Sequence, residues 1–109
     1  MKPAVFEDAK LAEIVRRLVD AYQPEAIYLF GSTARGAAGP DSDYDLLVIV
    51  PDSAEPERRR SRLAYQALRG TGAAADVIVS TRSRFDSRVH VKTSLPAIVR
   101  SEGKLLHAA

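Results

Sequence analysis

A run of five apolar residues, Leu46 to Val50, follows directly on the triplet Asp43-Tyr44-Asp45. A continuous apolar run of this length predicts a β-strand that is buried on both faces of its sheet. Such a strand needs a covering layer on each side, which favours an α/β or α+β sandwich. Because strand side chains alternate between faces, we expect Asp43 and Asp45 to share one face, about 6.6 Å apart along the chain, with Tyr44 on the other.

The rest of the chain predicts further helices and strands around that strand. In chain order we expect a helix over about 6–21, a strand over 26–30, a short helix over 32–36, a loop over 37–42, the strand over 43–50, a helix from 56 to about 69, a strand over 76–80, a helix over 95–101 and a last short strand over 104–107. Residues 81–93 show no clear pattern beyond a helical turn around 83–87. We therefore predict one domain, residues 1–109, in which a small mixed sheet is flanked by helices.

The two acids at the start of the buried strand suggest a metal site. Two carboxylates held side by side resist joint ionisation, and a hard divalent cation such as Mg²⁺ relieves their repulsion through oxygen ligands. Asp76 heads the next expected strand and is the best third acid. If the two strands are neighbours, Asp43, Asp45 and Asp76 converge at one edge of the sheet. The structural alternative is that Asp43 caps local backbone groups and that Asp76 merely begins a strand.

The segment before the acids carries groups that bind phosphate. Gly31 and Ser32 offer backbone N–H groups and a hydroxyl, and Arg35 offers a forked guanidinium. A phosphate site beside a metal site indicates a nucleoside triphosphate. As structural alternatives, Gly31 forms a tight turn after a strand, and Arg35 is an ordinary surface arginine.

Composition excludes several classes of function. The chain has no cysteine, so disulfides, thiolate metal sites and cysteine catalysis are excluded. The net charge of +2 implies no broad basic surface, which argues against direct nucleic-acid binding; the cluster at residues 58–60 and 62 reads as a solvated helix face or a partner contact. No apolar run approaches the ~20 residues of a membrane span and no signal peptide is apparent, so we expect a cytoplasmic protein.

Two stretches resemble the signature of the minimal nucleotidyltransferases of the polymerase-β-type superfamily: Gly31-Ser32-Thr33-Ala34-Arg35-Gly36 and Ser42-Asp43-Tyr44-Asp45-Leu46-Leu47-Val48. The tail from Ile98 to Leu106 is also similar to the end of these small proteins. The resemblance implies their fold and a Mg²⁺-dependent transfer of a nucleotide, commonly AMP from ATP. It also implies that Gly31 and Ser32 hold the triphosphate, and that Asp43 and Asp45 bind two Mg²⁺ ions. Asp76 matches the third carboxylate by position alone.

Many proteins of this family are antitoxins that adenylylate a tyrosine of a HEPN-domain RNase toxin, so the resemblance implies such a toxin as partner. Larger relatives use added domains to bind the acceptor, and we expect this chain to take that surface from a partner or a second copy of itself. Two alternatives stay open. The chain could neutralise its partner by occlusion through the arginine cluster and the apolar N-terminal helix, with catalysis dispensable, or it could adenylylate a small molecule such as an aminoglycoside.

Overall fold

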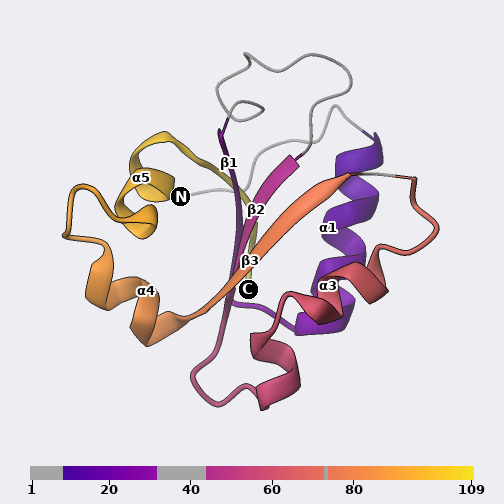
Figure 1. The fold of residues 1–109 in the computed structure, drawn as a ribbon, viewed down its shortest axis with the longest axis horizontal. Helices are drawn as coiled ribbons and strands as arrows, with labels where there is room; N and C mark the ends of the chain where they lie inside the picture. The colour runs from indigo at the N-terminus through magenta and orange to yellow at the C-terminus, as the bar shows by residue number, and fades with distance from the viewer. Residues whose placement is uncertain (1–8, 32–43, 73) are drawn as a thin grey trace.

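A four-stranded mixed sheet forms the centre of the computed structural model, which describes residues 9–31, 44–72 and 74–109 (Figure 1). The strands are β1 (Ala26–Phe30), β2 (Tyr44–Val50), β3 (Ala75–Thr81) and β4 (Lys104–Ala108), in the spatial order β3-β2-β1-β4. Strands β2 and β3 run parallel, whereas β1 pairs antiparallel with both β2 and β4. This arrangement confirms the predicted α+β architecture with a mixed sheet.

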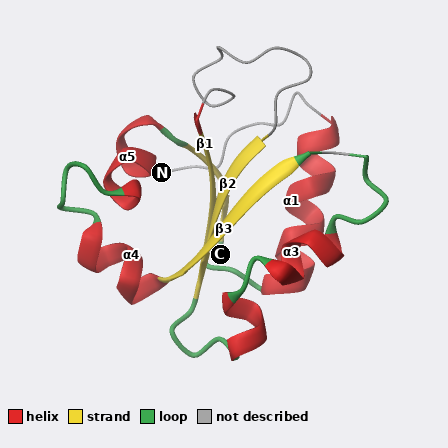
Figure 2. Ribbon diagram, viewed as in Figure 1, coloured by secondary structure: helices red, strands yellow, loops and turns green. Residues whose placement is uncertain are grey.

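Helices cover both faces of the sheet (Figure 2). On one side lie α1 (Ala9–Tyr22) and α3 (Arg62–Ala67), and on the other lie α4 (Arg82–Arg88) and α5 (Leu95–Glu102). Each face has its own apolar cluster, so β2 is buried on both sides as its apolar run predicts. Leu46 and Val48 join the cluster under α1, and Leu47 and Ile49 join the cluster under α4 and α5.

The helix expected from 56 to about 69 is interrupted in the structure. A 3-10 turn, Pro56–Arg59, is followed by extended backbone at Arg60, and α3 begins only at Arg62. The hydroxyl of Tyr22 donates to the carbonyl oxygen of Arg60 at 2.5 Å, which holds this carbonyl against α1 and away from a continuous helix. The prediction of one helix here was wrong because a tertiary contact overrides the local pattern.

The arginine cluster is exposed along 58–60 and at 62, in keeping with a solvated surface. Arg59 in this cluster also stabilises the preceding loop, because its side chain donates to the carbonyl oxygens of Ala54 and Asp52 at 2.8 and 2.9 Å. The apolar face of α1, by contrast, is buried in the core through residues such as Ile14 and Leu18, each 0% exposed. The expectation that this helix offers a free apolar surface was therefore wrong.

Two helices after β3 begin at hydroxyl caps. Thr81 accepts a hydrogen bond from the backbone N–H of Arg84 at 3.3 Å, and α4 then extends over a segment for which the sequence predicts only a helical turn. Ser94 accepts from the N–H of Ala97 at 3.3 Å and starts α5, as predicted. Among the described helices, none is long and apolar enough to cross a membrane. The expected helix over 32–36, the loop over 37–42 and the first residue of the strand over 43–50 lie outside the described residues.

Candidate functional site

Asp45 and Asp76 lie directly opposite each other at the start of β2 and β3, as Cα partners in the parallel ladder. Neighbouring strands are about 4.8 Å apart, so the two carboxylates can reach one cation. Both point to the sheet face that carries α4 and α5. Tyr44, the neighbour of Asp45, packs against the opposite cluster, as does Ala75, the neighbour of Asp76. The condition that the two strands are neighbours is met, and the predicted orientation of Tyr44 is confirmed.

Gly31 lies at the same corner of the sheet, at the end of strand β1. It follows β1, whose last residue, Phe30, is the ladder partner of Asp45. Its φ of +75° is a backbone conformation that L-residues other than glycine rarely adopt. A Cβ at this position would collide with the Asp45 Oδ2 and lie only 3.2 Å from its Cγ. Glycine thus permits the turn and lets the Asp45 carboxylate lie against the main chain.

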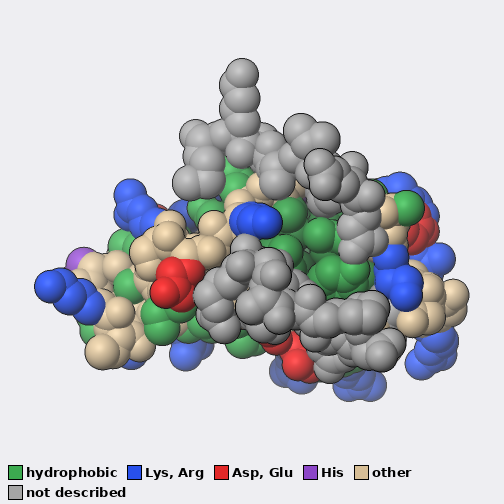
Figure 3. Space-filling model, turned by 90° about the horizontal axis from the view of Figure 1, so that it is seen from above, with side chains coloured by type: hydrophobic (Ala, Val, Ile, Leu, Met, Phe, Trp, Pro, Cys, Tyr) green, Lys and Arg blue, Asp and Glu red, His purple; other side chains and the backbone are tan. Residues whose placement is uncertain are grey.

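These three residues come together at one end of the sheet, where β1 ends and β2 and β3 begin (Figure 1). Figure 3 looks onto the molecule from that side and shows Lys and Arg side chains both at its margin and near its middle, where they lie beside hydrophobic side chains. The remaining predicted site residues, Ser32, Arg35 and Asp43, lie outside the described residues, so their roles stay predictions.

The donor set suits a hard divalent cation. Carboxylate oxygens from two adjacent strands are the ligands that Mg²⁺ prefers in proteins. Within the described ranges, no group of three or more His, Cys, Asp or Glu side chains is arranged to hold a metal. Asp45 and Asp76 are thus two candidate ligands, and the other expected acid, Asp43, precedes the described part of β2 by one residue.

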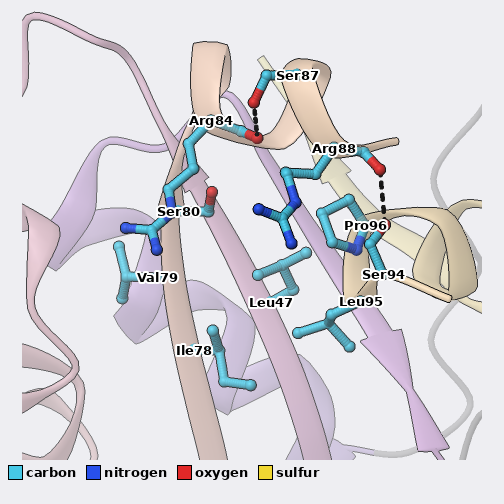
Figure 4. Close-up of a pocket in the computed structure, with 10 residues that line it drawn as sticks. All are labelled: Leu47, Ile78, Val79, Ser80, Arg84, Ser87, Arg88, Ser94, Leu95 and Pro96. Atoms are coloured by element: carbon cyan, nitrogen blue, oxygen red, sulfur yellow. Dashed lines mark hydrogen bonds between the residues drawn. The ribbon is translucent and has the colours of Figure 1, made fainter. Parts of the chain in front are cut away.

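A groove of about 460 Å³ lies on the same face of the sheet, beside these acids (Figure 4). Leu47 and Ile78 form its floor, Val79 and Ser80 of β3 also line it, and α4 and the start of α5 form its walls. Leu47 and Ile78 are each two residues beyond Asp45 and Asp76, so the groove begins about 7 Å along the strands from the two carboxylates. The sequence did not indicate this groove, because residues 81–93 predict only a helical turn where α4 forms.

Comparison with known proteins agrees with this geometry. The profile of the nucleotidyltransferase domain family matches residues 9–104, and the chain belongs to that family. No curated protein matches the sequence. The resemblance to the minimal nucleotidyltransferases, drawn from the two motifs, is supported by this result and by the solved structures that share the fold.

Three solved structures illustrate the shared fold. A toxin–antitoxin structure with AMP-PNP aligns over 94% of this chain and 75% of its own, with 22% identity and a TM-score of 0.59. A mutant of the MntA–HpeT toxin–antitoxin aligns over 90% and 73%, with 20% identity and a TM-score of 0.59. A candidate nucleotidyltransferase from Sulfolobus solfataricus aligns over 72% and 70%, with 29% identity and a TM-score of 0.52.

Proposed function

We propose that this chain transfers AMP from ATP to a tyrosine hydroxyl of a partner toxin of the HEPN class and thereby acts as its antitoxin. The observation that carries the proposal is the in-register pairing of Asp45 with Asp76 on one sheet face, against the backbone of Gly31. Acids from two strands thus lie beside the glycine turn that follows β1, which supports the proposal. Membership of the nucleotidyltransferase family supports transfer of a nucleotide as the reaction class.

In the proposed reaction, the acceptor oxygen forms a bond to the α-phosphorus of ATP. The bond from that phosphorus to the oxygen bridging the α- and β-phosphates breaks, and pyrophosphate leaves with the electron pair. The acceptor proton passes to the carboxylate of Asp76 and on to solvent. Gly31 and Ser32 hold the triphosphate, and Arg35 pairs with one of its phosphates.

Asp43, Asp45 and Asp76 would hold two Mg²⁺ ions, which supply charge neutralisation at the phosphates and lower the pKa of the acceptor hydroxyl. Both described acids are anchored by the sheet rather than by loops. Asp45 directly precedes Leu46, which is 0% exposed, and its strand is paired on both sides. Rigid placement of this kind is what a two-metal site requires.

The partner is proposed from two lines of support. The motifs resemble those of antitoxins in this family, and two of the structures that share the fold are toxin–antitoxin complexes, one of them with AMP-PNP. The test is to incubate the purified chain with ATP, Mg²⁺ and the product of the adjacent gene, and to measure the intact mass of that product. We expect a mass increase corresponding to whole AMP units, and no increase on any candidate acceptor would contradict the proposal.

Asp45→Asn and Asp76→Asn should each lower the rate of transfer at least about 10²-fold, because each removes a charge that faces the reacting phosphate. Asp20→Asn is the matched control, because Asp20 is an exposed acid on α1 whose only described ion pair is with Arg16. It should transfer at the wild-type rate. Wild-type rates in both site variants, with folding checked by thermal melts, would refute the assignment of these acids.

Occlusion without catalysis remains the competing function, and the exposed arginine cluster at 58–60 and 62 is the surface that favours it. The two functions separate in one assay. If the Asp76→Asn protein suppresses the partner as well as wild type at equal abundance, occlusion suffices and transfer is dispensable. An aminoglycoside-modification assay tests the small-molecule alternative in the same way.

A further inference from the structure

Two arginines of α4 point into the groove beside the acids. Arg84 and Arg88 are one helical turn apart, and their guanidinium groups extend from α4 toward the strands that line the groove (Figure 4). Their main-chain carbonyl oxygens accept hydrogen bonds from Ser87 and Ser94, but those bonds leave the guanidinium groups uninvolved.

Neither guanidinium forms an ion pair with any residue in the described ranges. Arg82 on the same helix contrasts with them, because it pairs with Glu25 at 3.3 Å and with Asp86 at 3.5 Å. Like charges at this spacing on a helix repel each other. Two unpaired cations above an apolar floor therefore form a site suited to a ligand that carries both carboxylates and apolar groups.

The in-line geometry of the reaction indicates which of the two substrates this groove binds. The attacking and leaving oxygens lie roughly in line on opposite sides of the reacting phosphorus. If the triphosphate lies at Gly31, at the end of β1, then the acceptor approaches the phosphorus from the side opposite to β1. That side is formed by Asp76 and β3. The groove lies on that side, because its floor comes from β2 and β3 and its wall from the helix that follows β3.

We propose that this groove binds an acidic segment of the acceptor protein, with carboxylates of that segment on Arg84 and Arg88 and the acceptor hydroxyl at Asp76. The proposal rests on the proposed function and adds the recognition of its substrate. An extended chain advances about 3.3 Å per residue, and Ser80, which lines the groove, is four residues along β3 from Asp76. The acidic residues should therefore lie about two to four positions from the acceptor residue.

The direct test uses two synthetic peptides with a central tyrosine, one flanked by glutamates and one by glutamines, and measures binding by fluorescence anisotropy without nucleotide. The glutamate peptide should bind about tenfold more tightly than the glutamine peptide, because it forms two arginine–carboxylate pairs. The double variant Arg84→Gln/Arg88→Gln should lose this difference. The control Arg69→Gln/Arg100→Gln removes two exposed charges elsewhere and should keep it.

A second measurement separates this proposal from the proposed function. In transfer to the adjacent-gene product, Arg84→Gln/Arg88→Gln should raise the KM for the acceptor about tenfold, leaving kcat and the Kd for ATP unchanged. Equal binding of both peptides by wild type, or an unchanged KM in the variant, would overturn the proposal. A raised Kd for ATP would also overturn it, because the groove would then hold the nucleoside. Charge-dependent peptide binding without AMP transfer would support the groove and contradict the proposed function.

Discussion

Replacing Gly31 by alanine tests whether the turn after β1 serves the acids or only the fold. Two effects are expected. The φ of +75° costs an alanine about 1–2 kcal/mol relative to glycine. In addition, the new methyl group would collide with the carboxylate of Asp45, which must shift by about 1 Å to restore an ordinary van der Waals separation.

Gly72→Ala is a matched control for the first effect alone. Gly72 has nearly the same φ, +70°, but a Cβ there meets nothing within 4 Å. Both variants should therefore lose about 1–2 kcal/mol from backbone strain, which corresponds to roughly 4 °C in melting temperature per kcal/mol for a domain of this size. Any further loss in Gly31→Ala measures the displacement of Asp45.

Activity should separate the two variants more sharply than stability does. A 1 Å misplacement of a reacting group can lower a rate about 10²-fold, so Gly31→Ala should lose AMP transfer to about this extent. Gly72→Ala should keep wild-type transfer at a temperature where it is folded. The assay is the rate of labelled AMP incorporation, alongside thermal and urea melts. Equal stability losses with full activity in Gly31→Ala would show that the contact with Asp45 has no catalytic consequence.

Two further predictions concern the core. Burial raises the pKa of Tyr22 to about 12, so the native state keeps this proton at a pH where the unfolded chain loses it. The contribution of this protonated hydroxyl to the free energy of unfolding is fully present below pH 10 and falls by about 2–3 kcal/mol as the pH rises from 10 to 12. Urea unfolding should show this loss in wild type and not in Tyr22→Phe, and equal pH slopes would contradict it. Ser94→Ala removes the cap of α5 and the hydroxyl that donates to the carbonyl of Arg88. The free energy of unfolding, measured in urea, should therefore fall by about 1–2 kcal/mol. An unchanged urea midpoint would contradict this prediction.

The sequence predicts the central part of this fold because local pattern and burial agree there. The apolar run of β2 requires cover on both faces, and the structure provides it with two helical layers. The pairing of Asp45 with Asp76 could be predicted only conditionally. Which strands are neighbours, and in which register, depends on how the connecting segments pack, and that information is not local.

Two helices show where local pattern is insufficient. Arg82–Arg88 has Phe85 as its one buried residue, so it lacks the apolar periodicity by which a helix is recognised in sequence. The expected helix from 56 to about 69 has a helical pattern, but the hydrogen bond from Tyr22 to Arg60 interrupts it from 38 positions away. The groove was missed for the first of these reasons, since α4 carries both of its arginines.

The two faces of the sheet differ in how completely helices cover them. The face under α1 and α3 is closed, and its helix contributes fully buried residues such as Ile14 and Leu18. The face under α4 and α5 is covered only in part, since Ile78 remains 43% exposed beside the groove. Asp45, Asp76 and the arginines of α4 all belong to this second face. In the proposed function, an acceptor would therefore reach the two acids along β3 without any opening of the main core, and changes in the groove should alter recognition while leaving the fold intact.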